Sequence, residues 1–446
     1  MKVPTYRVDR EYTENMKTTL LIFGITGDLS TRKLLPALEQ IISTGDFDDL
    51  SVIGVSRREV NIPELLQGSV GNTNMASRVT IFSMDLANAG DYRRLKTFVD
   101  LRDDEQLIVY LSVPPAAATD IVDFMGEAGV NTPNVKILFE KPFGVDLASA
   151  RDVIARTARY YNEAQLYRID HYLAKEMAQN IVAFRGSNAL FSHIWNNNFV
   201  EKIEIIASEK IGIEGRTQFY EQTGALRDFL QGHMMQLLAL TLMDIPHEFD
   251  WDSLPELRLH ALEQLQPADP AKAVRAQYDS YQAEVGNPGS QTETFVSVQL
   301  QSNQPRWLDV PITLTTGKAL AVKTTEVRIH LKKMHEAQSN CIVFKIQPNE
   351  GIDIELFTKK PGYDRKFETR HLSFNFPEDT KLPDAYEQVI VDAINSRKSL
   401  FTSSEEVIRS WEILQPIQHD WSMNMIARTY ANGSDIESIT TNIASE

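Results

Sequence analysis

The chain has 446 residues, of which 42% are hydrophobic and 24% are charged, which is the composition of a globular protein and excludes bulk disorder. The length favours two domains over one. The chain has 61 Asp and Glu but only 45 Lys and Arg, so its net charge is −16. This charge argues against nucleic acid as a partner, and any anion-binding site must be built from a few basic side chains close together.

Residues 1–15 are polar and have no clear period, so we expect an extension there, with Met16 as an alternative start. The single cysteine, Cys341, excludes an intrachain disulfide and lies in an apolar run typical of a buried side chain rather than a catalytic thiol. No apolar stretch is long enough to span a bilayer, and we predict neither a membrane partner nor a metal site. Without a signal peptide or a disulfide framework, the chain is expected to be cytoplasmic.

The first part of the chain alternates strand and helix patterns. Strands are expected at 18–23, 51–55, 79–84, 106–112, 135–139 and 165–169, with helical patterns between them, as at 34–41 and 146–161. Pro36 lies inside the first helical pattern and should kink or shorten it. Short apolar strands that alternate with helices predict a parallel sheet covered on both faces, over residues 16–176.

After residue 176 the pattern changes to α+β. A strand is expected at 201–208 and a long helix at 222–243. Further strands are expected at 295–302, 311–316, 325–332, 342–347, 352–358 and 371–376, and closing helices at 384–395 and 404–414. Strands in series with tight connections favour a mainly antiparallel sheet, so residues 177–446 are predicted to form a larger β+α domain.

A glycine-rich turn follows the first strand. In Gly24-Ile25-Thr26-Gly27-Asp28-Leu29, the glycines permit a tight turn and a close approach to a pyrophosphate at the start of the next helix. The spacing is not the full dinucleotide fingerprint, and an ordinary turn is the alternative. The position between strand and helix favours cofactor binding by Gly24, Thr26, Gly27, Asp28 and Leu29.

The second strand runs into Arg57 and Arg58 instead of the acidic residue typical of NAD sites. An arginine fork suits a 2′-phosphate, so NADP is the predicted cofactor, with NAD use not excluded. A solvated surface pair is the competing interpretation.

Two further segments lie at expected strand ends, where open α/β sheets bind ligands. Lys141 precedes Pro142, which biases it towards an extended conformation, although a plain surface lysine fits equally well. If a helix begins within 168–176, His171 and Lys175 share one helix face and form an anion cradle with Tyr172. Asp170 stays off that face and is free to orient another group.

His233 lies on a predicted helical stripe with Leu226, Leu230 and Leu237, so periodicity alone favours a core histidine. Oxidation of a hemiacetal hydroxyl requires a base, and histidine is the usual group at neutral pH. We therefore predict His233 as the base and Asp170 as the carboxylate that holds its tautomer.

These motifs together resemble the glucose-6-phosphate dehydrogenase family. The runs that carry the resemblance occur in the family's order from Thr18 to about Pro416: 27–29, 32–34, 140–144, 168–176, 224–236 and 383–387. The resemblance implies a Rossmann-like doubly wound domain followed by a β+α domain that forms a homodimer, or a dimer of dimers, through its sheet. It also implies the oxidation of glucose 6-phosphate to the 6-phosphogluconolactone, the first step of the pentose phosphate pathway.

The resemblance assigns roles by position. His233 matches the catalytic base and Asp170 its supporting carboxylate, while Thr26 and Arg57 match contacts to the NADP phosphate. Arg58 and Lys141 complete the cofactor set. The residues that match substrate contacts are Lys141, His171, Tyr172, Lys175, Glu209, Asp228, Lys318 and Lys323.

The chain departs from the family pattern at three positions. Ala174 replaces a usual glycine, and Gly232 replaces the asparagine before the base, which could loosen the helix. Thr315 stands where many members carry arginine, and the chain ends soon after the last helix. The last two points argue against a second, structural NADP site of the animal type.

Two other functions are compatible with parts of the sequence. A sugar oxidoreductase acting on unphosphorylated substrates also carries Glu-Lys-Pro after a Rossmann strand, but the cluster at 171–175 argues against it. A catalytically silent relative that regulates a true dehydrogenase is disfavoured by the joint presence of Lys141, Asp170 and His233.

Overall fold

The computed structural model describes residues 16–66, 73–334, 339–377, 380–425 and 428–441, so the extension expected at 1–15 lies outside the described residues. The chain separates into two compact units. Unit 1 comprises Met1–Phe143, Arg151–His171 and Pro383–Ser404, and unit 2 comprises Gly144–Ala150, Tyr172–Leu382 and Glu405–Glu446. A domain boundary between residues 176 and 177 stays a prediction.

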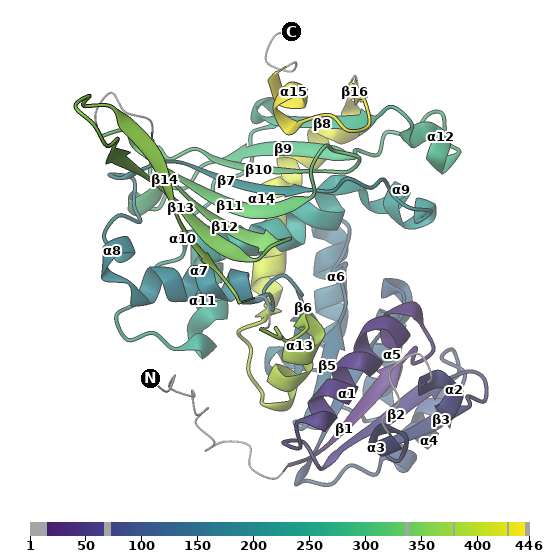
Figure 1. Ribbon diagram of the computed structural model, residues 1–446. Coiled ribbons are helices and arrows are strands. Elements are labelled where there is room, and N and C mark those ends of the chain that lie inside the picture. Colours follow the sequence, from purple (N-terminus) through teal and green to yellow (C-terminus); the bar gives the residue numbers. More distant parts are fainter. Residues whose placement is uncertain (1–15, 67–72, 335–338, 378–379, 426–427, 442–446) are drawn as a thin grey trace, which may run out of the picture. The chain divides into compact units, whose positions relative to one another are not determined.

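Unit 1 is built on a seven-stranded sheet in the order β15-β6-β5-β4-β1-β2-β3 (Figure 1). Its strands are β1 (Lys17–Phe23), β2 (Leu50–Ser56), β3 (Val79–Ser83), β4 (Glu105–Leu111), β5 (Val135–Phe139), β6 (Leu166–Ile169) and β15 (Phe401–Thr402). All pairs are parallel except β15 with β6. Every residue of the central strand β4 is buried, as a sheet covered on both faces requires. The predicted doubly wound sheet is confirmed.

Helices connect the parallel strands of unit 1. They are α1 (Leu35–Ser43), α2 (Ile62–Leu66), α3 (Thr73–Ala76), α4 (Ala89–Val99), α5 (Pro115–Glu127) and α6 (Leu147–Thr157), of which α6 begins in unit 2. The first helix opens with a π-helical turn, η1 (Ser30–Leu34), and changes to α1 just before Pro36. Pro36, which has no N–H to donate within a helix, is the second residue of α1 and lies directly after this change, and the kink or shortening expected there stays a prediction.

A segment from late in the chain, Pro383–Ser404, completes unit 1. Asp384 caps α13 (Ala385–Ile394) with a capping box and pairs with Lys33 at 2.9 Å. Lys136 Nζ donates to the carbonyl oxygen of Ala393 at 2.6 Å, and Lys398 Nζ donates to that of Leu166 at 2.6 Å. The edge strand β15 therefore docks on β6 through backbone and lysine hydrogen bonds together.

Unit 2 contains a nine-stranded sheet in the order β14-β13-β12-β11-β7-β10-β9-β8-β16. Its strands are β7 (Val200–Ser208), β8 (Ala273–Tyr278), β9 (Phe295–Leu300), β10 (Ile312–Gly317), β11 (Thr324–Leu331), β12 (Cys341–Gln347), β13 (Gly351–Lys359), β14 (Phe367–Asn375) and β16 (Thr429–Tyr430). Only β10 with β7 and β16 with β8 are parallel, so the predicted mainly antiparallel sheet is confirmed.

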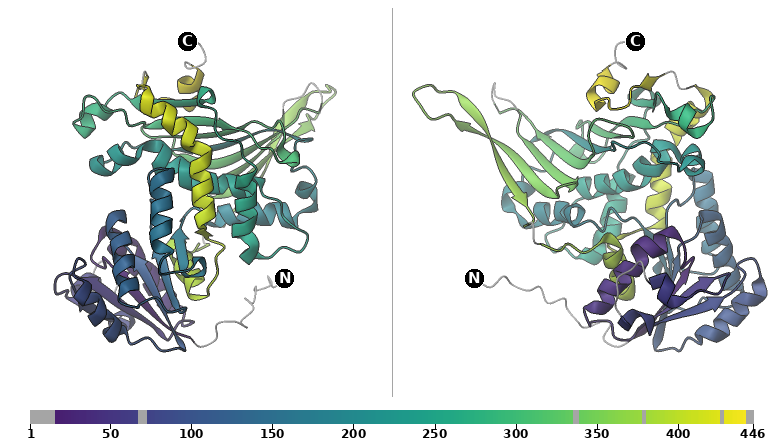
Figure 2. Two further views of the ribbon diagram at one scale, coloured as in Figure 1. Left: turned by 180° about the vertical axis from the view of Figure 1, so that it is seen from behind. Right: turned by 45° about the vertical axis from the view of Figure 1, so that its right-hand side comes forward.

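Helices cover this sheet and share its core. The main ones are α7 (Glu176–Ser187), α9 (Thr217–Ala225), η3 (Leu226–Met234), α10 (Met235–Leu242), α11 (Leu254–Glu263) and α14 (Ser404–Met423), and short ones are α8 (Ala189–Ser192), α12 (Tyr281–Val285) and α15 (Ile436–Thr441). The left view of Figure 2 shows α14 crossing the face of the sheet that is turned away from the viewer in Figure 1. Its buried Ile413 and Leu414 belong to the same apolar cluster as Leu237 of α10 and Val296 of β9. Cys341 is buried in β12, as expected, and burial raises the pKa of its thiol to about 12.

The prediction of a single long helix at 222–243 is wrong. Gly224, near the end of α9, has φ 61° and ψ 179°, which breaks the helix at that residue, and the chain continues as the π-helix η3 before it becomes α10. Only glycine adopts such a backbone conformation without a steric penalty. A local pattern of apolar residues carries no signal for this break.

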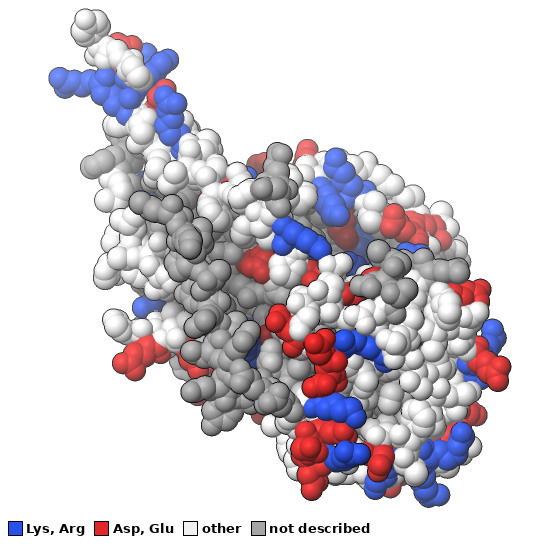
Figure 3. All heavy atoms as spheres, turned by 60° about the horizontal axis from the view of Figure 1, so that its bottom comes forward, with Lys and Arg blue, Asp and Glu red and all other residues white. Residues whose placement is uncertain are grey.

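The strands β13 and β14 project from the sheet as an arm with an exposed outer edge (Figures 1 and 3). Basic side chains gather at its tip, where Lys359, Lys360, Arg365 and Lys366 are all exposed. Apolar side chains of β14 also face solvent, with Phe367 68%, Leu372 60% and Phe374 51% exposed. An uncovered apolar edge strand is unusual in a monomer.

Candidate functional site

The glycine-rich turn forms a tight loop at the carboxyl edge of the parallel sheet. Gly24 has φ +80°, and a Cβ atom there would lie 2.2 Å from the carbonyl oxygen of Ser112. The N–H of Gly27 and the hydroxyl of Ser30 both donate to the Gly24 oxygen, at 2.9 and 2.8 Å. Thr26 and Asp28 are exposed at the turn, Leu29 is half-buried, and Asp28 pairs with Arg32 at 2.7 Å. The loop thus presents backbone and small polar groups at the strand ends, as a pyrophosphate site needs.

Arg57 and Arg58 follow β2, which is the parallel neighbour of β1, with Val55 opposite Phe23. Both side chains are exposed, and the N–H of Arg58 donates to the Ser56 hydroxyl at 3.1 Å. Within the described ranges, neither guanidinium is held in an ion pair. They therefore stand at the same sheet edge as the glycine-rich turn, with their side chains available to a ligand phosphate.

Lys141 and Asp170 follow the adjacent strands β5 and β6, in which Phe139 pairs with Arg168. Asp170 is buried, with 1% exposure, and Lys141 is half-buried. Glu140, which directly precedes Lys141, accepts a hydrogen bond from the Tyr110 hydroxyl. Burial raises the pKa of Glu140 to about 7, and the nearby Asp170 charge adds to the rise while Lys141 opposes it. Unit 1 thus holds the buried Asp170 and the half-buried Glu140 beside a lysine.

The prediction that His171 and Lys175 share one helix face is wrong. Residues 171–175 form turns, and α7 begins only at Glu176, with Lys175 as its N-cap. His171 belongs to unit 1, where its ring stacks on that of Tyr386 at 6.4 Å. Tyr172 begins unit 2. The prediction failed because the chain passes from unit 1 to unit 2 within these polar residues, which form turns instead of a regular helix.

Tyr172 and Lys175 are joined by two residues that sequence reasoning missed. Gln347 at the end of β12 accepts a hydrogen bond from Lys175 Nζ at 3.0 Å and donates one to the Tyr172 hydroxyl at 2.6 Å. Its Nε2 also donates to Thr325 Oγ1 at 3.2 Å. Lys175 lies 5.2 Å from the centre of the Tyr172 ring. The cationic group is therefore fixed at the end of the sheet by side chains from β11 and β12.

His233 lies on the π-helix η3 and is buried, with 6% exposure. Its ring centroid is 4.5 Å from that of Tyr172 and 5.1 Å from that of Phe229. The stripe of apolar residues around it, Leu226, Leu230 and Leu237, is buried as expected. The imidazole thus joins the Tyr172–Lys175 group through direct ring contact.

Glu209 and Lys318 come together where the parallel strands β7 and β10 end, with Ser208 opposite Gly317. They form a salt bridge in which Lys318 is almost fully buried. Lys318 Nζ also lies 5.4 Å from the centre of the Tyr220 ring. Burial raises the pKa of Tyr220 well above its usual value, and the charge of Asp228 on η3 adds to this rise. The pair thus contacts Tyr220 of α9, and the charge of Asp228 on the following helix acts on the same phenol.

Lys323 is exposed and precedes β11, whose first residue, Thr324, pairs with Ser208. The ends of β7, β10 and β12 and the start of β11 share one sheet edge. Unit 2 gathers five of the predicted substrate residues along this edge, Tyr172, Lys175, Glu209, Lys318 and Lys323, while Asp228 and His233 both lie on η3. Lys141, Asp170 and His171 form a separate group in unit 1.

Glu140, Gln347 and Thr325 were missed for different reasons. Glu140 stands inside the motif that drew attention to Lys141, and its burial is the signal that only the fold supplies. Gln347 and Thr325 reach the site through strand pairing between distant segments, which no local pattern reveals.

Within the described ranges, no group of three or more His, Cys, Asp or Glu side chains is arranged to hold a metal ion. No helix in the part of the chain that the structure describes is both long and apolar enough to cross a membrane.

Comparison with known proteins identifies the family. Residues 21–180 match the glucose-6-phosphate dehydrogenase NAD binding domain, and residues 182–444 match the C-terminal domain of the same family. Glucose-6-phosphate 1-dehydrogenase of Dickeya dadantii is 32% identical over 91% of both chains, and that of Borreliella burgdorferi is 33% identical over 90% of this chain and 92% of its own.

Solved structures agree with the sequence comparison. A glucose-6-phosphate dehydrogenase in complex with its substrate glucose-6-phosphate superimposes with a TM-score of 0.90 at 26% identity, over 96% of this chain and 98% of its own. Glucose-6-phosphate 1-dehydrogenase from Mycobacterium avium gives 0.85 at 29% identity, over 96% and 97%. The chain belongs to the glucose-6-phosphate dehydrogenase family.

Proposed function

We propose that this chain oxidises D-glucose 6-phosphate at C1 to 6-phospho-D-glucono-1,5-lactone with NADP as hydride acceptor. The observation that carries the proposal is the set of side chains along one sheet edge of unit 2. There His233 contacts Tyr172, Lys175 is fixed by Gln347, and Lys318 pairs with Glu209. A base and separate cations on one edge suit a sugar that carries a phosphate at its far end.

NADP fits the unit 1 strand ends. Gly24, Thr26, Gly27, Asp28 and Leu29 would hold the pyrophosphate side, because the turn is too tight for a side chain at Gly24. Arg57 and Arg58 would hold the 2′-phosphate, and Lys141 would complete the cofactor contacts. When bound, the nicotinamide supplies the hydride acceptor.

The residues of the chain then supply position and proton transfer. His233 takes the proton of the C1 hydroxyl, and Asp170 holds the imidazole tautomer and stabilises the imidazolium. His171, Tyr172 and Lys175 bind the phosphate, and Lys141, Glu209, Asp228, Lys318 and Lys323 contact and align the sugar. The salt bridge of Lys318 with Glu209 keeps both groups oriented before substrate arrives.

An absorbance assay for reduced nicotinamide tests the function directly. The purified chain is given NADP or NAD with either glucose 6-phosphate or glucose. We expect reduction of NADP that requires the phosphate. Equal activity on free glucose would favour a different sugar oxidoreductase, and no turnover with any pair would favour a catalytically silent relative.

The proposal extends to assembly and location. A homodimer or dimer of dimers through the unit 2 sheet is supported by the exposed apolar side chains of β14. A cytoplasmic location without nucleic acid or membrane partners is consistent with the net charge of −16. Light scattering at several protein concentrations measures the assembly.

A further inference from the structure

We propose that Glu293 is a positioning residue that fixes the start of the helix carrying Asp228 and His233. This inference rests on the proposed function, since it concerns the placement of the base. Glu293 lies just before β9, far in sequence from the helix, and it is buried, with 5% exposure.

Glu293 satisfies two backbone donors at the point where the helix restarts. The break at Gly224 leaves the following N–H groups without partners inside the helix. The N–H of Ala225 donates to the backbone oxygen of Glu293 at 2.9 Å, and that of Leu226 donates to its Oε1 at 3.0 Å. One residue therefore caps η3 from another part of the chain.

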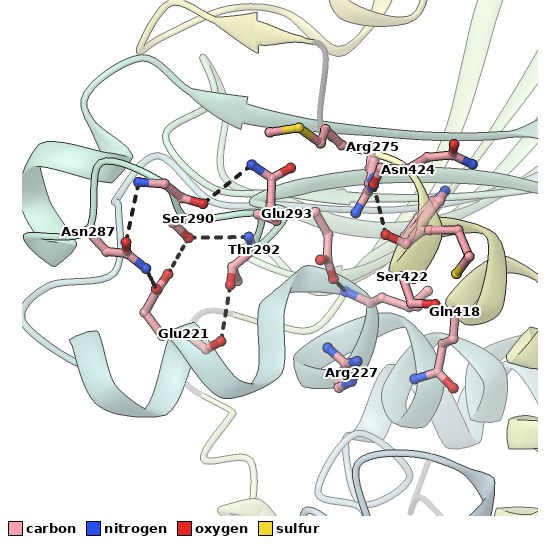
Figure 4. A pocket seen from close by; sticks show the side chains of 16 residues that line it. Glu221, Arg227, Arg275, Asn287, Ser290, Thr292, Glu293, Gln418, Ser422 and Asn424 are labelled. Atoms are coloured by element: carbon pink, nitrogen blue, oxygen red, sulfur yellow. Dashed lines mark hydrogen bonds between the residues drawn. The ribbon is translucent and has the colours of Figure 1, made fainter.

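The close approach of Glu293 depends on Gly224. A Cβ atom at position 224 would lie 2.4 Å from Glu293 Oε1, and the backbone there has φ +61°. Glu293 also lines a cavity of about 470 Å³, where Figure 4 shows its carboxylate directed at the start of the helix. The contact is thus a tight fit between a bare backbone and one carboxylate oxygen.

The next residue links this cap to the Lys318 pair. The carbonyl oxygen of Thr294 accepts the N–H of Lys318 at 3.0 Å, and the Tyr430 hydroxyl joins Thr294 Oγ1 at 2.9 Å to the Lys318 oxygen at 2.7 Å. Residues 293–294 therefore tie the helix of His233 and the strand end of Lys318 to one another. A shift of Glu293 would change the spacing between these two groups.

A purely electrostatic role is the competing explanation, because a negative charge at a helix start is favourable by itself. The positioning role and the electrostatic role predict opposite results for two substitutions of Glu293. Glu293→Gln keeps the length and an acceptor oxygen but removes the charge. Glu293→Asp keeps the charge but withdraws the oxygen by one methylene.

The experiment compares these variants in the full-length protein by measuring kcat and KM for both substrates and the melting temperature. Positioning predicts that Glu293→Gln retains kcat within about 3-fold, while Glu293→Asp loses about 10- to 100-fold, because small displacements of a base are costly. The KM for NADP should change little in either. Glu293→Met, which matches the length without an acceptor, replaces the Asp variant if that fails to fold, and the same loss is expected.

Glu221→Gln is the matched control. Glu221 lines the same cavity and accepts hydrogen bonds from Tyr281 at 2.6 Å, Ser290 at 2.6 Å and Asn287 at 2.9 Å, away from the helix start (Figure 4). Its kcat should match that of the parent protein. A low kcat in folded Glu293→Gln, or a normal kcat in Glu293→Asp or its Met replacement, would overturn the inference. Absence of turnover in the parent chain would instead reject the proposed function.

Discussion

The two units of this chain assemble their parts of the candidate site in different ways. In unit 1 the candidate residues stand in short runs directly after parallel strands, as with Gly24 after β1 and Arg57 after β2. In unit 2 they come from three strand ends, a turn and a π-helix spread over 152 residues, from Tyr172 to Lys323. A parallel sheet places consecutive strand ends at one edge, whereas a mainly antiparallel sheet alternates them.

The difference teaches where sequence motifs carry information. In unit 1 a motif also reveals its position in the fold, because the parallel strand that precedes it places it at the carboxyl end of the sheet. In unit 2 the neighbours are chosen by pairing: Thr325 faces Gln347 across β11 and β12, and Gly317 faces Ser208 across β10 and β7. Substitutions can test whether the two regions also divide the chemistry.

The largest expected effect is that of His233→Asn in unit 2. Loss of the base should lower turnover with glucose 6-phosphate by about 10²–10⁴-fold. The amide is smaller but polar, so the ring contacts with Tyr172 and Phe229 are lost while the helix remains. Steady-state kinetics and thermal unfolding measure the two effects separately. Near-normal turnover would make His233 a core residue and remove the chemical role of this region.

Lys318→Met should mainly weaken substrate binding. Removal of one partner from a buried charged pair costs about 2–5 kcal/mol, and about 10²-fold in KM for glucose 6-phosphate is expected, with KM for NADP unchanged. Lys210→Met is the control, since Lys210 follows Glu209 but is exposed. If both KM values rise together, the division between the units fails.

Arg57→Ala probes unit 1 in the same way. One lost charge-assisted contact should weaken NADP by about 1.5–3 kcal/mol and leave NAD nearly unaffected. Arg58→Ala, measured in parallel by cofactor titration, shows how much the second guanidinium contributes. Equal losses for NADP and NAD would show that Arg57 does not contact the 2′-phosphate.

A smaller effect concerns stability of unit 1. Burial lowers the pKa of Lys398 to about 7 and that of Lys136 to about 8. Below pH 7 Lys398 is charged in both folded and unfolded chains, so the burial penalty is fully present. Between pH 7 and its ordinary pKa of 10.5 the unfolded chain binds more protons, and folding gains stability as pH rises.

The variant Lys398→Met isolates the contribution of Lys398 deprotonation to stability. Its stability relative to the parent chain should fall by about 1–3 kcal/mol between pH 6 and pH 9, because only the parent gains from deprotonation. Denaturant unfolding at the two pH values measures the difference. Parallel pH curves for the two proteins would show that Lys398 keeps its proton throughout.

Sequence reasoning located most strands because short apolar runs bounded by turns are direct signals of burial. It missed β8, whose first three residues are only half-buried, and β15 and β16, which have two residues each. It also predicted one helix at 222–243, since the break at Gly224 depends on the contact with Glu293. Pairs such as Lys318 with Glu209 emerged only from family resemblance, because their proximity is set by pairing between distant strands.

The return of Pro383–Ser404 into unit 1 has a consequence for biosynthesis. A ribosome that has made the first six strands of this unit has not yet made β15, the Ala393 carbonyl group that accepts from Lys136, or Lys398, which donates to Leu166 of β6. Until more than two hundred further residues emerge, the edge of β6 lacks its neighbour. The sheet of unit 1 therefore stays incomplete during synthesis, with one side of β6 unpaired. Truncated products would expose that edge to pairing with other polypeptides.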